Sequence, residues 1–320
     1  MKEKKFLVLD TETTTLPIAN NYDSDQKQRI AIARPLIYDI GYVIINASGK
    51  ILKKVNYLVE DVYDVPELFN TAYYSNKREI YEMLLEKGEI TIEKWYNILK
   101  TLESDLQDVE CIAAANATFD FKKAIPFTNE FFYHKDYKGD FVKWLDSQKT
   151  IIENIACGVK SDCKNTEYLK PVFTLFKKDY VLTDIWTLAC NHFSDSVRFK
   201  KFCINNEKTT KSVQFFSTTV ETIYSYYKKN VEYVESHTAL DDAIVESEIL
   251  SKLIKAGDFN IELSAFPFKK LGTTIEFVKE KYPKGREKIK QQLQAYITEN
   301  NGDTINNSYW IKVKKLYNEL

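Results

Sequence analysis

The feature that most constrains the fold of this chain is a short apolar run followed at once by two acids. Residues Phe6–Leu9 are all apolar, and Asp10 and Glu12 come directly after them. Such a run before a polar segment predicts a short buried strand. Side chains alternate along a strand, so both carboxylates leave the same face. Carboxylates beside a buried strand are costly without a positive partner, and hard divalent cations prefer carboxylate oxygens. The stretch therefore predicts a metal site; a polar strand end is the alternative for Asp-x-Glu taken alone.

Composition sets limits on the class of protein. The 320 residues are 44% hydrophobic and 28% charged, with a net charge of -1. This balance is typical of a globular chain and excludes a uniformly basic nucleic-acid coat, so any nucleic-acid contact has to come from a local patch. The segment 1–5 leads into only four apolar residues, too few for a signal peptide, and no apolar run approaches a membrane span. We expect a cytoplasmic protein with no membrane partner.

The first half of the chain predicts a meander followed by a crossover. Two strands, over 36–45 and 50–59, are separated by turn residues and follow the acidic strand. A helix with one apolar stripe is predicted over 91–106, and a strand of small residues over 109–115. A helix between two strands favours a parallel crossover, so we expect this strand to pair with the first. Asp120 follows it as a third acid.

The second half contains a long region without regular spacing of its hydrophobic residues. It is followed by a segment whose hydrophobic residues recur at helical spacing. Residues 126–178 are interpreted as an insertion with its own short elements. The helix that opens near His237 and Asp242 ends near residue 256. The predicted domains are therefore 1–256, which carries the acids, and a helical extension over 257–320.

Three acidic motifs in this order resemble the DEDDh 3′–5′ exonuclease family, which includes polymerase proofreading subunits (DnaQ-like) and RNase T. The matching segments are 10–13, 116–120 and 237–243, and the segment 184–189 is similar to the Asp-Thr-Leu element of that family. The resemblance covers residues 4–256, interrupted by the insertion. It implies an α/β, ribonuclease-H-like fold, with a mixed sheet of about five strands flanked by helices.

The resemblance also implies the chemistry of the site. Phosphodiester hydrolysis through two metal ions needs clustered carboxylates, which here are Asp10, Glu12, Asp120 and Asp242. The implied cofactor is Mg²⁺, two ions, with Mn²⁺ as a substitute. His237 is the implied general base, because its ordinary pKa suits proton removal near neutral pH. The expected product is a nucleoside 5′-monophosphate.

The choice between the adjacent acids Asp241 and Asp242 rests on helical phase. With about 3.6 residues per turn, Asp241 shares a stripe with charged residues such as Lys252, which is typical of a solvated face. Asp242 instead lies between Ile249 and Leu253. Phase and the spacing of the family both favour Asp242 as the ligand.

Two residues also have structural interpretations. His237 alone would be an ordinary residue at a helix start, and only its acidic partners favour catalysis. Asp39, within the second predicted strand, is either a fifth acid near the site or a structural residue, and we favour the structural role.

Substrate contacts are predicted less directly. Thr11 and Thr13 offer hydrogen-bond donors near the metal strand, and Leu16 offers a surface on which a base can pack. Asn116 either orients the loop before Asp120 or contacts substrate. The expected partner is a single-stranded or frayed 3′ end, with DNA favoured over RNA, and a polymerase or replication protein is a further expected partner. Two alternatives remain, an exoribonuclease or oligoribonuclease and a nucleic-acid-binding or polymerase-accessory module whose nuclease activity is secondary or lost.

Overall fold

Strand β1 (Lys5–Thr13) is the central strand of the sheet, and its apolar residues lie in the core as the sequence predicts. Leu7, Val8 and Leu9 have no exposed surface. This computed structural model describes residues 4–14, 35–136, 138–140, 142–144, 147, 169–299, 315–318 and 320. The strands are β1, β2 (Ile37–Asn46), β3 (Ile51–Val59), β4 (Thr91–Glu93), β5 (Cys111–Ala114), β6 (Val172–Leu175) and β7 (Lys178–Asp184).

The sheet is mixed, with the order β4-β3-β2-β1-β5-β7-β6. The first three strands form the predicted antiparallel meander. β5 pairs parallel to β1, with Phe6 opposite Cys111 and Val8 opposite Ala113, so the predicted crossover is confirmed. Parallel pairing beside the acidic strand brings the end of β5 to the edge at which Asp10 leaves the core.

The mixed α/β architecture is confirmed, and the described sheet has seven strands where about five were expected. The two additional strands, β4 and β6, are the short edge strands. β4 lies at the start of the range 91–106 that was predicted to be helical. Helix α5 begins only at Trp95. β6 lies in the region interpreted as an insertion. A strand of three or four residues is too short to show a recognisable alternation of apolar and polar side chains.

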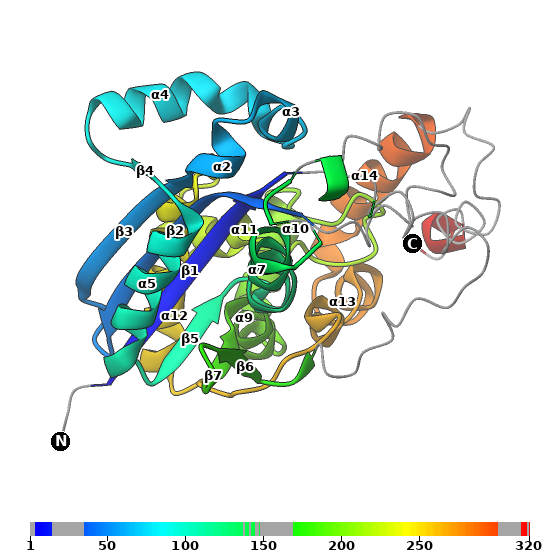
Figure 1. The fold of residues 1–320 in the computed structure, drawn as a ribbon. Helices are drawn as coiled ribbons and strands as arrows, with labels where there is room; N and C mark the ends of the chain where they lie inside the picture. Colours follow the sequence, from blue (N-terminus) through cyan, green and yellow to red (C-terminus); the bar gives the residue numbers. More distant parts are fainter. Residues whose placement is uncertain are drawn as a thin grey trace. The chain divides into compact units, whose positions relative to one another are not determined.

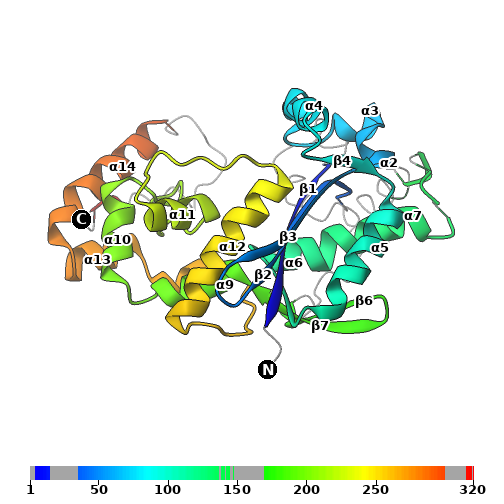
Figure 2. The ribbon, with the colours of Figure 1, turned by 90° about the vertical axis from the view of Figure 1, so that its left-hand side faces the viewer.

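Helices cover both faces of the sheet. In Figures 1 and 2, α12 (Ala239–Ala256) lies against one face, and α5 (Trp95–Asp105) and α7 (Ile125–Tyr133) cover the other. The remaining helical segments around the sheet are α2 (Glu60–Tyr63), α3 (Pro66–Phe69), η2 (Ser75–Lys77), α4 (Arg78–Glu86), η3 (Leu106–Asp108), α6 (Ala117–Phe119) and η4 (Asp120–Ala124).

The chain groups into two compact units. Unit 1 comprises Met1–Ile185, Ser236–Lys252 and Ile261–Leu263, and it holds the whole sheet. Unit 2 comprises Trp186–Glu235, Leu253–Asn260 and Ser264–Leu320. The predicted segment 1–256 therefore includes the sheet together with residues that group with unit 2, and the predicted division at residue 256 stays a prediction.

Unit 2 is built of short helices around an aromatic core. Phe193 and Phe199 stack with their ring centroids 4.1 Å apart. Its helical segments, the first of which begins one residue earlier in unit 1, are α9 (Ile185–Phe193), α10 (Val197–Asn205), α11 (Val220–Lys228), η6 (Pro267–Leu271), α13 (Thr274–Glu280), η7 (Pro283–Gly285) and α14 (Arg286–Glu299). Residues 300–314 and 319 of the predicted helical extension lie outside the described residues.

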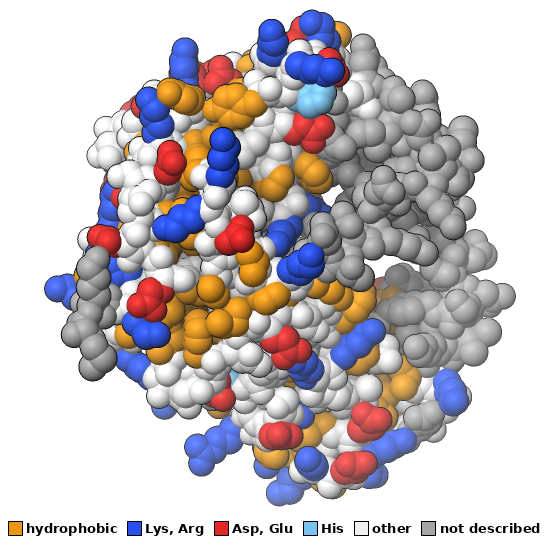
Figure 3. Space-filling model, turned by 60° about the horizontal axis from the view of Figure 1, so that its bottom comes forward, with side chains coloured by type: hydrophobic (Ala, Val, Ile, Leu, Met, Phe, Trp, Pro, Cys, Tyr) orange, Lys and Arg blue, Asp and Glu red, His pale blue; other side chains and the backbone are white. Residues whose placement is uncertain are grey.

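One face of the molecule shows how its charges are distributed. On the face drawn in Figure 3, lysine and arginine side chains are interspersed with aspartate and glutamate side chains. None of the helices in the described part of the chain has the length and apolar character that crossing a membrane requires.

Candidate metal centre

The two acids of β1 lie where the strand leaves the core. Asp10 and Glu12 are both half-buried, and in the register with β2 they face Gly41 and Asp39. The strand pairing shifts between Glu12 and Thr13. The regular ladder therefore ends immediately after the second acid.

Asp120 reaches the same edge of the sheet through a tight turn after β5. Asn116 adopts a left-handed conformation with a φ of 60°, which asparagine tolerates better than most residues. Its successor Ala117 donates its backbone N–H to the Asp184 carboxylate at 2.9 Å. Asp120 itself is 2% exposed and begins the π-helical turn η4, a geometry frequent at functional sites. Asp184, at the end of β7, thus fixes the loop that carries Asp120.

Thr11 holds Asp120 from the opposite side. Its Oγ1 donates a buried hydrogen bond to Asp120 Oδ1 at 2.7 Å. Thr11 was predicted to contact substrate, but its hydroxyl donates its hydrogen bond to the carboxylate of Asp120. The residue is better placed to orient Asp120 than to bind a nucleotide.

Replacing Thr11 by valine keeps the shape of the side chain and removes this hydrogen bond. Because partners that orient metal ligands typically contribute 10–100-fold, we expect the affinity for a divalent cation to fall by roughly that factor. A Mn²⁺ titration measures the effect. An unchanged affinity would show that Asp120 does not depend on Thr11 for its orientation.

The start of α12 supplies the third part of the cluster. Asp242 is 7% exposed, and His237 Nδ1 lies 3.9 Å from Asp242 Oδ2. Asp241 is exposed, and its Oδ2 accepts a hydrogen bond from Thr238 Oγ1 at 3.1 Å. The buried and exposed positions follow the helical phase that favoured Asp242.

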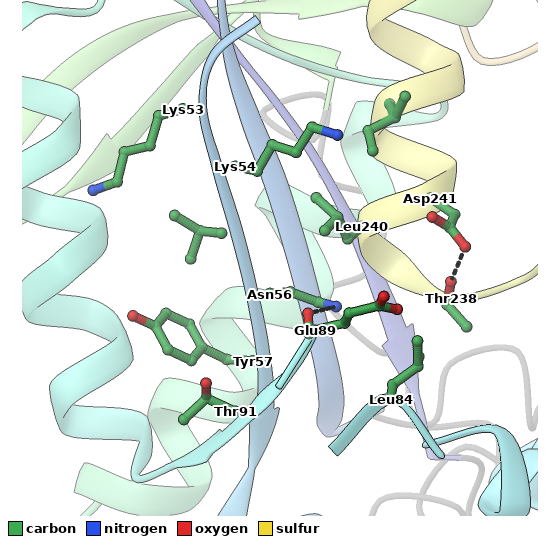
Figure 4. Close-up of a pocket in the computed structure, with 12 residues that line it drawn as sticks. Lys53, Lys54, Asn56, Tyr57, Leu84, Glu89, Thr91, Thr238, Leu240 and Asp241 are labelled. Atoms are coloured by element: carbon green, nitrogen blue, oxygen red, sulfur yellow. Dashed lines mark hydrogen bonds between the residues drawn. The ribbon is translucent and has the colours of Figure 1, made fainter. Parts of the chain in front are cut away.

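Asp241 faces a separate groove of about 560 Å³ beside β3 and β4. Figure 4 shows Asp241 and Thr238 on its α12 side, with Lys54 extending toward this helix. Lys53 points the other way, where its Nζ pairs with Asp105 Oδ1 at 2.6 Å. The groove is lined by Lys53, Lys54, Val55, Asn56, Tyr57, Leu84, Glu89, Thr91, Thr238, Leu240, Asp241 and Ile244.

Gly41 allows α12 to approach the sheet closely enough for the charge of Asp242 to act on Asp10. A Cβ at this position would lie 2.1 Å from the backbone nitrogen of Leu240 and 2.4 Å from the carbonyl carbon of Ala239. Backbone atoms cannot yield in the way that a flexible side chain can. Any larger residue at position 41 must push the start of α12 away from β2.

We therefore expect Gly41→Ala to destabilise the chain by about 3 kcal/mol and to weaken the binding of a divalent cation at the acidic cluster. Gly88→Ala is the matched control, because a Cβ at Gly88 meets nothing within 4 Å and its φ of +68° carries only the strain of a left-handed residue. Thermal unfolding and a Mn²⁺ titration measure both effects in the two variants. Equal effects of the two variants would contradict the close-approach argument.

Asp39 anchors the first turn of α12. It has no exposed surface, and its Oδ2 accepts hydrogen bonds from the Ala239 backbone N–H and from Tyr81 Oη, both at 2.9 Å. Burial raises its pKa to about 7, and these two donors lower it in part. Asp39 thus makes the structural contacts that the sequence favoured, and it is also a fifth acid near the site, because its charge raises the pKa of Glu12 and of Asp242.

Burial and mutual repulsion raise the pKa of the clustered acids. Burial is the largest cause of the raised pKa of Asp10, and the charges of Glu246, Asp120, Glu12 and Asp242 raise it further. Burial likewise raises the pKa of Glu12 to about 9 and the pKa of Asp120 and of Asp242 to about 7. Without a cation these carboxylates retain protons near neutral pH. The cluster is therefore arranged to favour a bound positive charge.

The donor set fits a hard divalent cation. Ligand atoms of Glu12, His237 and Asp242 all lie within 4.8 Å of one another. Asp10 and Asp120 add further carboxylates to the same charge cluster. Carboxylate oxygens are the preferred ligands of both Mg²⁺ and Mn²⁺.

Two charged residues near the acidic cluster were missed from the sequence. Glu246 is 3% exposed, and its Oε2 accepts the Ala115 backbone N–H at 2.9 Å. Its position four residues after Asp242 places it one turn further on the same helical stripe, which is the signal that would have identified it. Lys77 lowers the pKa of both Glu12 and Asp242, and nothing in the local sequence marks it.

The predicted substrate residues have mixed positions. Thr13 is half-buried at the end of β1, and Asn116 is exposed. Leu16 lies outside the described residues. The conformation of Asn116 supports a role in orienting the loop, and the contacts of Thr13 and Asn116 with substrate remain predictions.

Comparisons with known proteins yield a distant structural likeness. Neither the protein-family models nor the curated proteins match this chain. Among solved structures, the chain is similar to the crystal structure of cell-death related nuclease 4 (CRN-4), with a TM-score of 0.33 and 12% sequence identity. The alignment covers 80% of this chain and 65% of the other, so this chain spans less than two thirds of that protein's length. A likeness of this degree defines neither a family nor an activity.

Proposed function

We propose that this chain is a metal-dependent 3′–5′ exonuclease that acts on single-stranded or frayed ends, with DNA favoured. The observation that carries the proposal is the convergence of acids from three distant segments. Asp10 and Glu12 come from β1, Asp120 from the turn after β5, and Asp242 from α12, and they raise one another's pKa. His237 lies beside this cluster. A structural salt-bridge network would not place so many like charges together without cations.

The chemistry of each side chain indicates its proposed role in catalysis. Asp10, Glu12, Asp120 and Asp242 would hold two Mg²⁺ ions, which supply Lewis-acid stabilisation of the attacking and leaving oxygens. Nδ1 of His237 faces Asp242, so we assign Nε2 as the atom that takes the proton of the attacking water. Cleavage of the terminal phosphodiester would release a nucleoside 5′-monophosphate.

The distribution of charge bears on the kind of nucleic acid that the chain would bind. A net charge of -1 and interspersed surface charges favour a short contact at the strand end over extended binding to a duplex. We retain as proposals a cytoplasmic location and a polymerase or replication partner. An exoribonuclease and a binding module without activity are the alternatives.

Incubation of 5′-labelled single-stranded DNA and RNA with Mg²⁺ tests the proposal. We expect a ladder of products shortened from the 3′ end, favouring DNA, and its loss in Asp120→Ala. We expect His237→Ala to reduce the rate by roughly 10²–10⁴-fold, the usual contribution of a general base. A ladder on RNA alone would establish the exoribonuclease alternative. Binding without shortening in Mg²⁺ or Mn²⁺ would refute the enzymatic proposal.

A further inference from the structure

The segment that connects β3 to β4 reaches the loop that carries His237. The Tyr74 ring stacks on the His237 imidazole, with centroids 4.4 Å apart and planes inclined by 15°. Lys77 places its Nζ 4.5 Å above the Tyr74 ring and donates to the backbone carbonyl of Ser236. Tyr74 therefore contacts the side chain of the proposed base, while Lys77 contacts the residue before it.

The His237 backbone has an uncommon conformation. Its φ is 51°, in the left-handed region that few residues with a side chain adopt, although histidine does so more often than most. Residues persist in this region when their surroundings fix them, and they concentrate at functional sites. Here the contacts are an aromatic stack on the ring and a hydrogen bond on the preceding carbonyl.

The supporting segment is itself well anchored. Tyr81 has no exposed surface and donates to Asp39, which also accepts the first N–H of α12. The Arg78 guanidinium lies 4.8 Å from the Tyr63 ring centroid and 4.6 Å from that of Phe69. Tyr74 and Lys77 are thus fixed relative to the start of α12.

We propose that Tyr74 and Lys77, together called the clasp, are positioning residues that hold His237 in the orientation needed to accept a proton. The inference rests on the proposed function, since it assigns His237 the role of base. Tyr74 would fix the plane of the imidazole through stacking, and Lys77 would fix the backbone at Ser236. The clasp would then contribute to turnover and little to substrate affinity.

A variant series isolates the role of the Tyr74 ring. Tyr74→Leu removes the aromatic face, and we expect kcat to fall by roughly 10²-fold with KM nearly unchanged, as is typical of misplaced catalytic groups. Tyr74→Phe keeps the face and should retain most activity. Tyr96 is the matched control, because it is 55% exposed on α5 and carries its own lysine, Lys100, 4.4 Å from the ring centroid. Tyr96→Leu should leave kcat unchanged.

A double variant separates positioning from general damage to the fold. If Tyr74 acts through His237, Tyr74→Leu should cause no further loss in a His237→Ala background, because residues that act as a unit are not additive. The same 10²-fold loss in both backgrounds would overturn the proposal. A raised KM with an unchanged kcat would place Tyr74 at the substrate and would also overturn it.

NMR tests the clasp without any activity. The chain has three histidines, so the ring protons of His237 can be assigned with a single His237→Ala variant. Stacking on Tyr74 should shift these signals upfield, and Tyr74→Leu should move them downfield while Tyr74→Phe does not. Unchanged signals in Tyr74→Leu would refute the clasp. If this shift occurs but the wild type degrades no nucleic acid, the proposed function fails and the contact stands.

Discussion

Asp242→Asn should hydrolyse a single-stranded oligonucleotide about 10³-fold more slowly than the wild type, because losing a metal ligand removes several kcal/mol of transition-state stabilisation. The neighbouring substitution Asp241→Asn should change the rate by no more than about two-fold, because surface substitutions have small effects. The two side chains are adjacent and alike in charge. They differ in that Asp242 is 7% exposed beside His237, whereas Asp241 is exposed and bonded to Thr238.

Initial rates at saturating Mg²⁺ compare the two variants under one condition. Thermal unfolding of both in the absence of metal serves as the control for folding. Comparable losses of activity in well-folded Asp241→Asn and Asp242→Asn would contradict the assignment of the ligand from helical phase.

Metal binding should stabilise the protein strongly at alkaline pH and weakly at acidic pH. Folding raises the pKa of Asp120 and Asp242 from 3.8 to about 7 and that of Glu12 from 4.5 to about 9. For a group whose folded pKa is raised, the stabilising contribution is fully present below about pH 4 and is lost as the pH rises through the folded pKa. The metal-free protein should therefore lose stability between about pH 4 and pH 9. A divalent cation offsets this loss because it binds the deprotonated carboxylates.

Thermal unfolding with and without Mn²⁺ measures this linkage. With metal at about 100 times its Kd, we expect about 2.7 kcal/mol of stabilisation for each bound ion at pH 8, or roughly 4 °C in Tm per ion for a chain of 320 residues. The increment should shrink at pH 5.5, where protons compete for the carboxylates, and it should be smaller in Asp10→Asn, which lacks one of the clustered carboxylates. An increment of the same size at both pH values would show that the cation binds elsewhere.

The fold could be predicted where the side-chain period was strong. The buried strand before Asp10, the meander and the parallel pairing of β5 with β1 all follow from apolar runs and turn residues. The short edge strands β4 and β6 could not be recognised, because three or four residues carry almost no periodic signal.

The site shows a similar division between local and long-range information. Asp241 and Asp242 could be told apart by helical phase, a property of one helix. The hydrogen bond from Thr11 to Asp120 joins residues 109 positions apart, and the Tyr74–His237 stack joins two separate elements. Such contacts depend on how elements pack, so Thr11 was interpreted as a substrate residue and Tyr74 was not identified at all.

Mn²⁺ binding followed by electron paramagnetic resonance, in the absence of nucleic acid, tests the central claim most directly. At pH 8 the wild type should bind two ions per chain, as two-metal hydrolysis requires, and Asp241→Asn should match it. Asp10→Asn should lose at least one of the two ions, because Asp10 lies among Glu12, Asp120, Asp242 and Glu246. Failure of the wild type to bind Mn²⁺, or equal binding by Asp10→Asn, would contradict the assignment of this cluster as a metal centre.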